Sequence, residues 1–331
     1  MMRAIRNLLL LAIVLAAAAA GWLHYFNGHP LELPRTPYEF TVRSGASVKS
    51  LARQLADDGL FAEPHSFWIL ARALGRSAVI QAGTYRLERP LTPGELLDKL
   101  ARGDVVLADI LFVEGTTFRQ WRAQLAQHPQ LRATLAGKEE PEIRAALGIE
   151  QAHIEGWLFP STYRFAPGTS DLELLKRAHA AMKKRLADGW AARDTTVPLK
   201  SPYEALILAS IVEKETGAAP ERPIIAGVFA NRLRRGMRLQ TDPTVIYGIG
   251  EKFDGNIRKR DLTDDTPWNT YTRDGLPPTP IAMPGAGSIA AVMHPAQTEA
   301  LYFVGKGDGT HYFSATLEEH NRAVAKYQLK R

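Results

Sequence analysis

A long apolar run near the N-terminus constrains this chain more than any other feature of its sequence. The run LLLLAIVLAAAAAGWLHYF covers 19 residues, from Leu8 to Phe26, and holds no aspartate, glutamate, lysine or arginine. As a helix it would rise roughly 28 Å, about the thickness of the hydrocarbon core of a bilayer. We therefore expect a transmembrane helix over residues 8–26 rather than a helix buried in a soluble domain.

The flanks of this run predict its orientation. Arg3 and Arg6 precede it, and positive charge favours the cytoplasmic side, so residues 1–7 are expected to be cytoplasmic. Trp22 and Tyr25 suit the opposite interface. A cleaved signal peptide is the alternative, because the alanine run offers a small-residue cleavage site. In both cases the chain after about residue 28 would be exported.

Composition narrows the classes of function. The chain has 331 residues, 45% of them hydrophobic, which is enough for two or three domains. Its net charge of +6 fits an anionic partner, but there is no long lysine or arginine run that would favour nucleic acid. With no cysteine, no HExxH histidine pair and no glycine-rich phosphate loop, we expect neither a metal nor a nucleotide, and no cofactor.

The rest of the chain divides by pattern into an α+β protein. Residues 27–39 hold three prolines and read as a linker. Residues 40–88 predict a strand, two helices and a returning strand, a βααβ unit that resembles a LysM glycan-binding module. Residues 89–154 form a second, connecting α/β subdomain. Residues 155–331 gather Pro, Gly, Asn, Thr and aromatic clusters, typical of functional loops, and are expected to be a mixed α/β catalytic domain.

One helix in the last segment carries an unusual end. In SPYEALILASIVEKETG, Ser201 is a suitable N-cap, Pro202 suits the first turn, and Glu204 would complete a capping box. The apolar residues that follow leave almost no polar face, so the helix should be buried, with Gly217 as its stop.

Glu213 and Glu215 lie in the last turn of that helix, each continuing an apolar stripe. Burial and the negative end of the helix dipole both raise a carboxyl pKa, and a carboxyl that is protonated near neutrality can act as a general acid. In the alternative reading, one glutamate pairs with an arginine and the other faces water.

Two further clusters are open to more than one reading. In LQTDPTVIYG, Asp242 beside a proline fits an aspartate-capped turn as well as a cleft. In NRLRRGMR, four arginines including Arg232 fit a solvated helix C-terminus better than a carboxylate-binding site.

Several motifs occur in the order and spacing of the MltG/YceG-like endolytic murein transglycosylases, a family which this chain resembles over essentially its whole length. They are VEGTTF, EGWLFPSTY, ASIVEKET, NRLRRGMRLQTDPTVIYGIG, TPWNTYTRDGLPPTPIAMPG, and HPA with LYFV. The resemblance implies cleavage of the β-1,4 bond between N-acetylmuramic acid and N-acetylglucosamine inside glycan strands. The product is a 1,6-anhydro ring, formed without water, so the enzyme would be a lyase that ends the elongation of nascent strands.

The resemblance also implies roles for residues. Glu215, the second glutamate of the EKET run, falls on the family's catalytic acid–base position. Expected substrate-binding residues are Glu213, Gln240, Thr241, Asp242, Asn269, Tyr271, Glu155 and Trp157, the last two being equally compatible with packing.

The resemblance further implies that the enzyme is a single-pass inner-membrane protein with a periplasmic catalytic domain. Its expected partners are peptidoglycan strands and peptidoglycan synthases. Two alternatives remain: a water-using muramidase with Glu213 and Glu215 both catalytic, and a non-catalytic scaffold that binds glycan.

Overall fold

The computed structural model of the chain describes residues 2–43 and 45–329, a mixed α+β protein in two compact units. The first unit consists of residues 1–108 and 164–168, and the second of residues 109–163 and 169–331. Met1, Ser44, Lys330 and Arg331 lie outside the described residues, so the outermost ends of the predicted segments 1–7 and 155–331 are not described.

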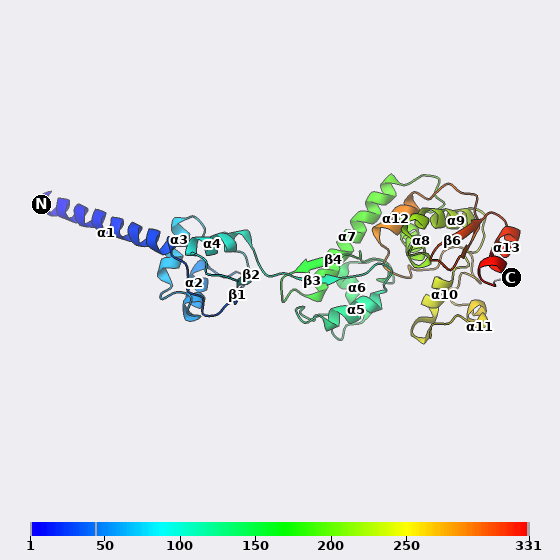
Figure 1. The fold of residues 1–331 in the computed structure, drawn as a ribbon, viewed down its shortest axis with the longest axis horizontal. Coiled ribbons are helices and arrows are strands. Elements are labelled where there is room, and N and C mark those ends of the chain that lie inside the picture. The colour runs from blue at the N-terminus through cyan, green and yellow to red at the C-terminus, as the bar shows by residue number, and fades with distance from the viewer. Residues whose placement is uncertain (1, 44, 330–331) are drawn as a thin grey trace. The chain divides into compact units, whose positions relative to one another are not determined.

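The apolar run forms helix α1 (Met2–Gly28; Figure 1). Its segment Ile5–Gly28, with a mean hydropathy of 2.0, is the one helix in the described part of the chain that is long and apolar enough to cross a membrane. The last turns of α1 pack within the first unit: Trp22 Nε1 donates a hydrogen bond to Ser66 Oγ at 3.0 Å. The length and hydropathy of α1 are compatible with a membrane anchor, but Trp22, Leu23 and Phe26, which lie inside the predicted span 8–26, pack within the first unit.

The first unit follows the predicted strand–helix–helix–strand order. Its elements are β1 (Tyr38–Val42), α2 (Val48–Asp57), α3 (His65–Ala73) and β2 (Gly83–Leu87). Strands β1 and β2 pair antiparallel, with Tyr38 opposite Leu87 and Val42 opposite Gly83. Ser47 caps α2 as expected, accepting a hydrogen bond from the Ser50 N–H at 3.1 Å.

The core of the first unit extends beyond this βααβ motif on both sides. Helix α4 (Pro93–Arg102) buries Leu96, Leu97 and Leu100 in the same apolar core. Leu31, within the predicted linker, is buried there too, and its N–H donates to the Leu91 carbonyl at 2.8 Å. Residues on either side of the motif therefore stabilise it.

The second unit is mainly helical. Its helices and 3-10 helices are α5 (Phe118–Gln127), α6 (Glu140–Leu147), α7 (Asp171–Ala192), α8 (Pro202–Glu215), η1 (Ala219–Glu221), α9 (Arg222–Arg234), α10 (Asp242–Ile249), η2 (Gly250–Lys252), α11 (Lys259–Thr263), α12 (Ala286–Met293) and α13 (Leu317–Tyr327). The remaining strands of the chain are β3 (Ala108–Leu111), which pairs with β4 (Thr162–Phe165), and β5 (Tyr302–Gly305), which pairs with β6 (His311–Ser314). Strands β5 and β6 pair antiparallel, with Gly305 opposite His311.

Helix α8 lies at the centre of the second unit, where it packs against α7, α9, α10 and α12 (Figure 1). Its residues from Ala205 to Val212 are all buried, as the apolar sequence predicts. Ser210 has no access to solvent, and its hydroxyl donates to the Ile207 carbonyl at 2.7 Å and accepts from the Ile281 N–H at 2.9 Å. The helix is therefore held rigidly up to its last turn.

Both predicted ends of α8 need a correction. Ser201 caps the helix, accepting from the Glu204 N–H at 3.2 Å, but the Glu204 carboxylate accepts from the Lys200 N–H, so the predicted capping box is not closed. The helix ends at Glu215 rather than being stopped by Gly217. Thr216 is already extended, and its hydroxyl accepts the Ala218 N–H at 2.9 Å, which turns the chain away.

Candidate active site

The last residue of α8 lies on the wall of a cleft of about 460 Å³ in the second unit. The other walls come from the segment before α10, the strands β5 and β6, and helix α13. Polar residues on the cleft wall are Glu215, Arg232, Gln240, Thr241, Asp242, Tyr271, Tyr302, His311, His320 and Gln328. Besides Glu215, four of the predicted site residues line this cleft: Gln240, Thr241, Asp242 and Tyr271. The structure thus brings together residues from three separate parts of the sequence.

Glu215 is held at the cleft by the residue before α10. The Thr241 hydroxyl donates a hydrogen bond to Glu215 Oε1. Burial of the carboxyl raises its pKa to about 7, against the lowering effect of the Thr241 hydrogen bond; the charge of Asp242 raises it further, and those of His311 and Arg232 lower it. A carboxyl with this pKa exchanges its proton near neutrality, as a general acid and base must.

A turn before α10 places Gln240, Thr241 and Asp242 on the cleft. Gln240 takes a left-handed backbone conformation, with φ of 48°, and its N–H donates to the Thr270 carbonyl at 3.1 Å. Asp242 is the first residue of α10 rather than the cap of a turn, and its carboxylate accepts from the Tyr271 hydroxyl at 2.5 Å. The turn therefore carries a hydroxyl donor and a carboxylate beside Glu215.

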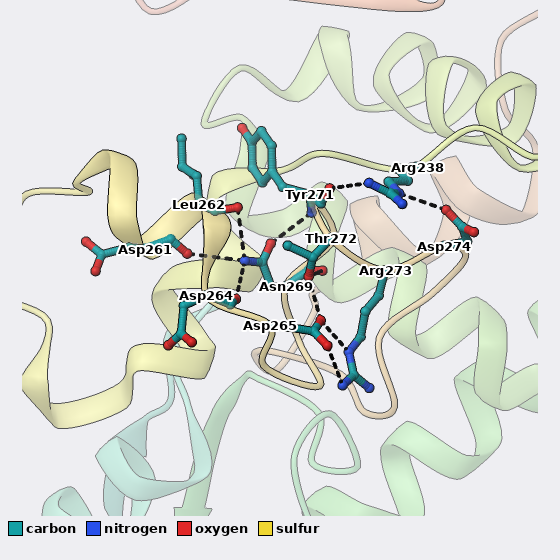
Figure 2. A network of polar contacts seen from close by, with 10 residues as sticks. All are labelled: Arg238, Asp261, Leu262, Asp264, Asp265, Asn269, Tyr271, Thr272, Arg273 and Asp274. Carbon is teal, nitrogen blue, oxygen red and sulfur yellow. Dashed lines mark hydrogen bonds and ion pairs between the residues drawn. The ribbon is translucent and has the colours of Figure 1, made fainter.

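Tyr271 reaches the cleft because Asn269 organises its loop (Figure 2). The buried Asn269 amide nitrogen donates to the carbonyls of Asp261, Leu262 and Asp264 at 3.2, 3.3 and 2.6 Å. Its Oδ1 accepts from the Tyr271 N–H at 2.9 Å. The structure thus brings Tyr271 to the cleft and uses Asn269 inside the loop.

Two ion pairs also hold the loop that carries Tyr271. Arg238 donates to the Tyr271 carbonyl at 3.0 Å and pairs with Asp274 at 2.9 Å, while Arg273 pairs with Asp265 at 2.9 Å (Figure 2). Burial and the hydrogen bond to Asp242 both raise the pKa of Tyr271, which keeps it a neutral donor at the cleft.

Glu213 lies elsewhere. Its carboxylate accepts from the Gly285 N–H at 2.9 Å and the Ser288 hydroxyl at 2.7 Å, at the start of α12, and pairs with Arg222 at 3.4 Å. Its side chain is 5% exposed, and it is not part of the wall around Glu215. The structure therefore separates the two glutamates: one secures a helix N-terminus, where negative charge is stabilised, and the other faces the cleft.

Glu155 faces a second cavity of about 700 Å³ in the same unit, whose wall also includes Lys214, Tyr247 and Trp268. Its carboxylate accepts from the Phe118 N–H at 3.1 Å and the Tyr247 hydroxyl at 3.3 Å, and burial raises its pKa to about 8.

Trp157, by contrast, is buried and lines neither cavity. It stacks on Tyr203 with ring centroids 5.8 Å apart. Of its two expected roles, the structure shows packing.

Arg232 was expected at a solvated helix end, and that expectation is wrong. The residue is buried, and its guanidinium donates to the carbonyls of Leu301 at 2.6 Å and Leu239 at 2.8 Å. These carbonyls replace water as acceptors. The sequence held a signal for this burial, because Arg232 continues the apolar stripe of Ile225, Val228 and Phe229 at helical spacing.

His311, which lines the cleft, is paired with Glu221, and the sequence reasoning missed this pair. His311 Nδ1 lies 2.7 Å from Glu221 Oε2, and the His311 N–H donates to Glu221 Oε1 at 2.8 Å. Although burial opposes it, hydrogen bonding from His311 and Thr216 lowers the pKa of Glu221. The two residues are 90 positions apart, so no local pattern connects them. Over residues 2–43 and 45–329, no group of three or more His, Asp or Glu side chains is arranged to hold a metal ion.

Comparisons with known proteins give one consistent result. The profile of the YceG-like family matches residues 40–326. The chain is 31% identical to a Bacillus subtilis protein named endolytic murein transglycosylase, over 88% of this chain and 85% of the relative. A Streptococcus pneumoniae protein of the same name is 28% identical over 86% of this chain and 57% of its own length.

A solved structure agrees with these sequence relatives. The crystal structure of a YceG-like protein from Listeria monocytogenes superposes with a TM-score of 0.56 at 30% identity, covering 87% of this chain and all of that one.

Proposed function

The chain belongs to the YceG-like family, and on that premise we propose that it is a membrane-anchored endolytic murein transglycosylase with Glu215 as its acid–base group. The observation that carries the proposal is the position of Glu215: the end of a rigid buried helix, on a cleft wall, with its pKa raised to about 7. The names of the Bacillus and Streptococcus relatives supply the substrate class and the reaction class.

The proposed reaction uses one carboxyl twice. Protonated Glu215 donates its proton to the oxygen that bridges N-acetylmuramic acid C1 and N-acetylglucosamine C4, and the C1–O bond breaks. The Glu215 carboxylate then accepts the proton of the muramic acid C6 hydroxyl as its oxygen attacks C1. The products are a 1,6-anhydro end and a free C4 hydroxyl, with no water consumed, and Glu215 is protonated again. Thr241 and the charge of Arg232 support the carboxylate between the two steps.

An internal nucleophile explains why a second catalytic carboxylate is not needed. Ordinary glycosidases use two carboxylates across the bond, one of them to act on water or to form a covalent intermediate. Glu213, the expected second carboxylate of a muramidase, is instead occupied with Gly285, Ser288 and Arg222. This arrangement favours transglycosylation over hydrolysis by the Glu213–Glu215 pair.

Asp242 is a second carboxylate in the same cleft as Glu215. Hydrolysis by the Asp242–Glu215 pair is therefore the alternative to be tested. Its hydrogen bond from Tyr271 fits a role in holding sugar hydroxyls. We assign substrate binding to Gln240, Thr241, Asp242 and Tyr271, and a supporting role to Asn269.

The remaining parts of the chain fit a wall-associated enzyme. We assign α1 as a retained anchor with a cytoplasmic N-terminus. The βααβ motif of the first unit is proposed as a LysM-like element that holds glycan. The enzyme would cleave nascent strands beside peptidoglycan synthases.

Two isosteric variants test the role assignment. Glu215→Gln keeps the side-chain volume but cannot deliver a proton, so turnover of purified glycan strands should fall about 10²–10⁴-fold while the thermal midpoint is retained. Glu213→Gln should cost less activity, and should lower the thermal midpoint, because it weakens the pairing with Arg222. If Glu213→Gln were inactive and Glu215→Gln remained active, the catalytic acid would be Glu213 and not Glu215.

A further inference from the structure

The His311–Glu221 pair has no part in the reaction described above, although His311 lines the same cleft as Glu215. Glu221 ends the short helix η1 that follows α8, and His311 opens strand β6. Both side chains are 15% exposed, and their atoms approach to 2.7 Å. His311 borders the cleft, and when its ring is protonated its charge acts on Glu215.

Contacts of the pair determine which ring nitrogen is available. Glu221 is a carboxylate with a lowered pKa, hence an acceptor, so His311 Nδ1 carries the proton and donates. In a neutral ring Nε2 is then an acceptor. Among the described residues nothing forms a hydrogen bond with His311 Nε2, and the ring is held edge-on to Phe303, 5.4 Å between centroids. Glu221 and Phe303 thus orient the ring of a residue that lines the cleft.

The pair is also connected to the chain directly after the acid. The Thr216 hydroxyl lies 3.4 Å from Glu221 Oε2, and it accepts the Ala218 N–H at 2.9 Å. Through this contact, Thr216 of the EKET run connects the position of the Glu221–His311 pair to that of Glu215. A histidine needed only for packing would not require both Glu221 and Phe303 to orient its ring.

We propose that His311 is a second catalytic residue, which accepts at Nε2 a hydrogen bond from a hydroxyl or acetamido N–H of the sugar bound at Glu215, and that Glu221 is its positioning residue. This assignment rests on the proposed function. A fixed acceptor in the same cleft as the acid restricts the rotation of the sugar ring, so that the bridging oxygen lies at the Glu215 carboxyl. Such orientation accelerates a reaction without any change in chemistry.

Removal of the ring gives the first test. His311→Ala should lower kcat/KM for purified glycan strands about 10- to 100-fold, since one oriented hydrogen bond to the reacting sugar is lost. Added imidazole should restore part of the activity, whereas pyrrole, a ring of the same size without an acceptor nitrogen, should not, which separates hydrogen bonding from refilled packing. His294→Gln, an exposed histidine outside the cleft, is the matched control and should behave as wild type. Wild-type kcat/KM in His311→Ala, or a loss that imidazole leaves unchanged at an unaltered thermal midpoint, would overturn the proposal.

A double-variant cycle tests the positioning role. Glu221→Gln still accepts from the His311 N–H but holds the ring less firmly, so it should lower kcat/KM by less than His311→Ala. If Glu221 acts through the ring, the double variant should be no slower than His311→Ala. Additive losses would contradict that coupling. Failure of the proposed function itself would look different: wild-type enzyme would then yield no anhydro ends, whatever the histidine variants do.

Discussion

Glu213 and Glu215 are two residues apart in sequence, yet their carboxyl groups have different surroundings. Glu213 is satisfied by a backbone N–H, a hydroxyl and an arginine, and Glu215 by the single hydroxyl of Thr241. The first arrangement suits a structural role. The second suits a group that gives up and regains a proton, because little is lost when it is neutral.

Burial raises the pKa of Glu215 and the Thr241 hydroxyl lowers it, which leads to a prediction for pH dependence. Glu215 must be protonated to act, so wild-type activity should fall as pH rises through about 7. Thr241→Val removes a donor to the carboxylate and raises its pKa further, so this limb of the kcat/KM profile should move to higher pH. Thr241 caps α10 without a side-chain bond, so the cap should survive. Thr263→Val, at an exposed threonine, is the control; an unmoved or lowered limb in Thr241→Val would contradict the role.

Glu155 should make stability depend on pH. Its pKa of about 8 in the folded chain exceeds the value of 4.5 of a free carboxyl, so the folded state keeps a proton that the unfolded state has lost. Stability is therefore fully present below about pH 4.5 and declines as pH rises towards 8, by up to about 4 kcal/mol for this group. Glu155→Gln should flatten the decline in thermal midpoint between pH 5 and pH 8. An equal decline in wild type and variant would show that Glu155 is ionised throughout.

At the scale of elements, the sequence predicts what is local. The apolar stripe and the Ser201 cap predict α8, and strand and helix periodicity predict the order β1, α2, α3, β2. The position of Thr241 against Glu215, 26 residues away, and of His311 against Glu221 depends on how α10 and β6 pack, and no local pattern encodes such packing. Arg232 lies between these cases: its apolar stripe indicates burial, but one of its carbonyl acceptors, that of Leu301, is 69 residues away.

The turn after Glu155 gives a prediction at this scale. Gly156 has φ of 83°, and a Cβ there would lie 2.5 Å from Pro280 Cβ, in the segment that follows the Tyr271 loop. Gly156→Ala combines backbone strain with a clash, so it should destabilise the second unit by about 2–4 kcal/mol.

Gly236 offers a matched control for that substitution. It also has a positive φ, of 65°, but no atom lies within 4 Å of its Cβ position, so Gly236→Ala should cost only the strain. Thermal unfolding of both variants separates the two effects. Equal midpoints would mean that Pro280 moves aside without cost.

At the scale of the whole molecule, the anchor and its orientation are testable because the chain has no cysteine. Single cysteines at Asn7 and Glu88, on either side of the span, can be probed in intact cells with a thiol reagent that does not cross the inner membrane. With residues 1–7 cytoplasmic and the rest exported, Glu88→Cys should be labelled and Asn7→Cys should be labelled only after lysis. Labelling of Asn7→Cys in intact cells would reverse the orientation, and a mature N-terminus downstream of Ala20 would show that the span is cleaved.

The most direct measurement for the central claim is the mass of the new glycan ends that the wild-type enzyme produces in water enriched in a heavy oxygen isotope. If Glu215 directs attack by the C6 hydroxyl, each new muramic acid end is an anhydro ring, lighter than a reducing end by one water and free of the heavy isotope. Glu215→Gln should produce almost none of these ends. Reducing muramic acid ends that carry the heavy oxygen would show that water is the nucleophile, and would contradict transglycosylation by Glu215.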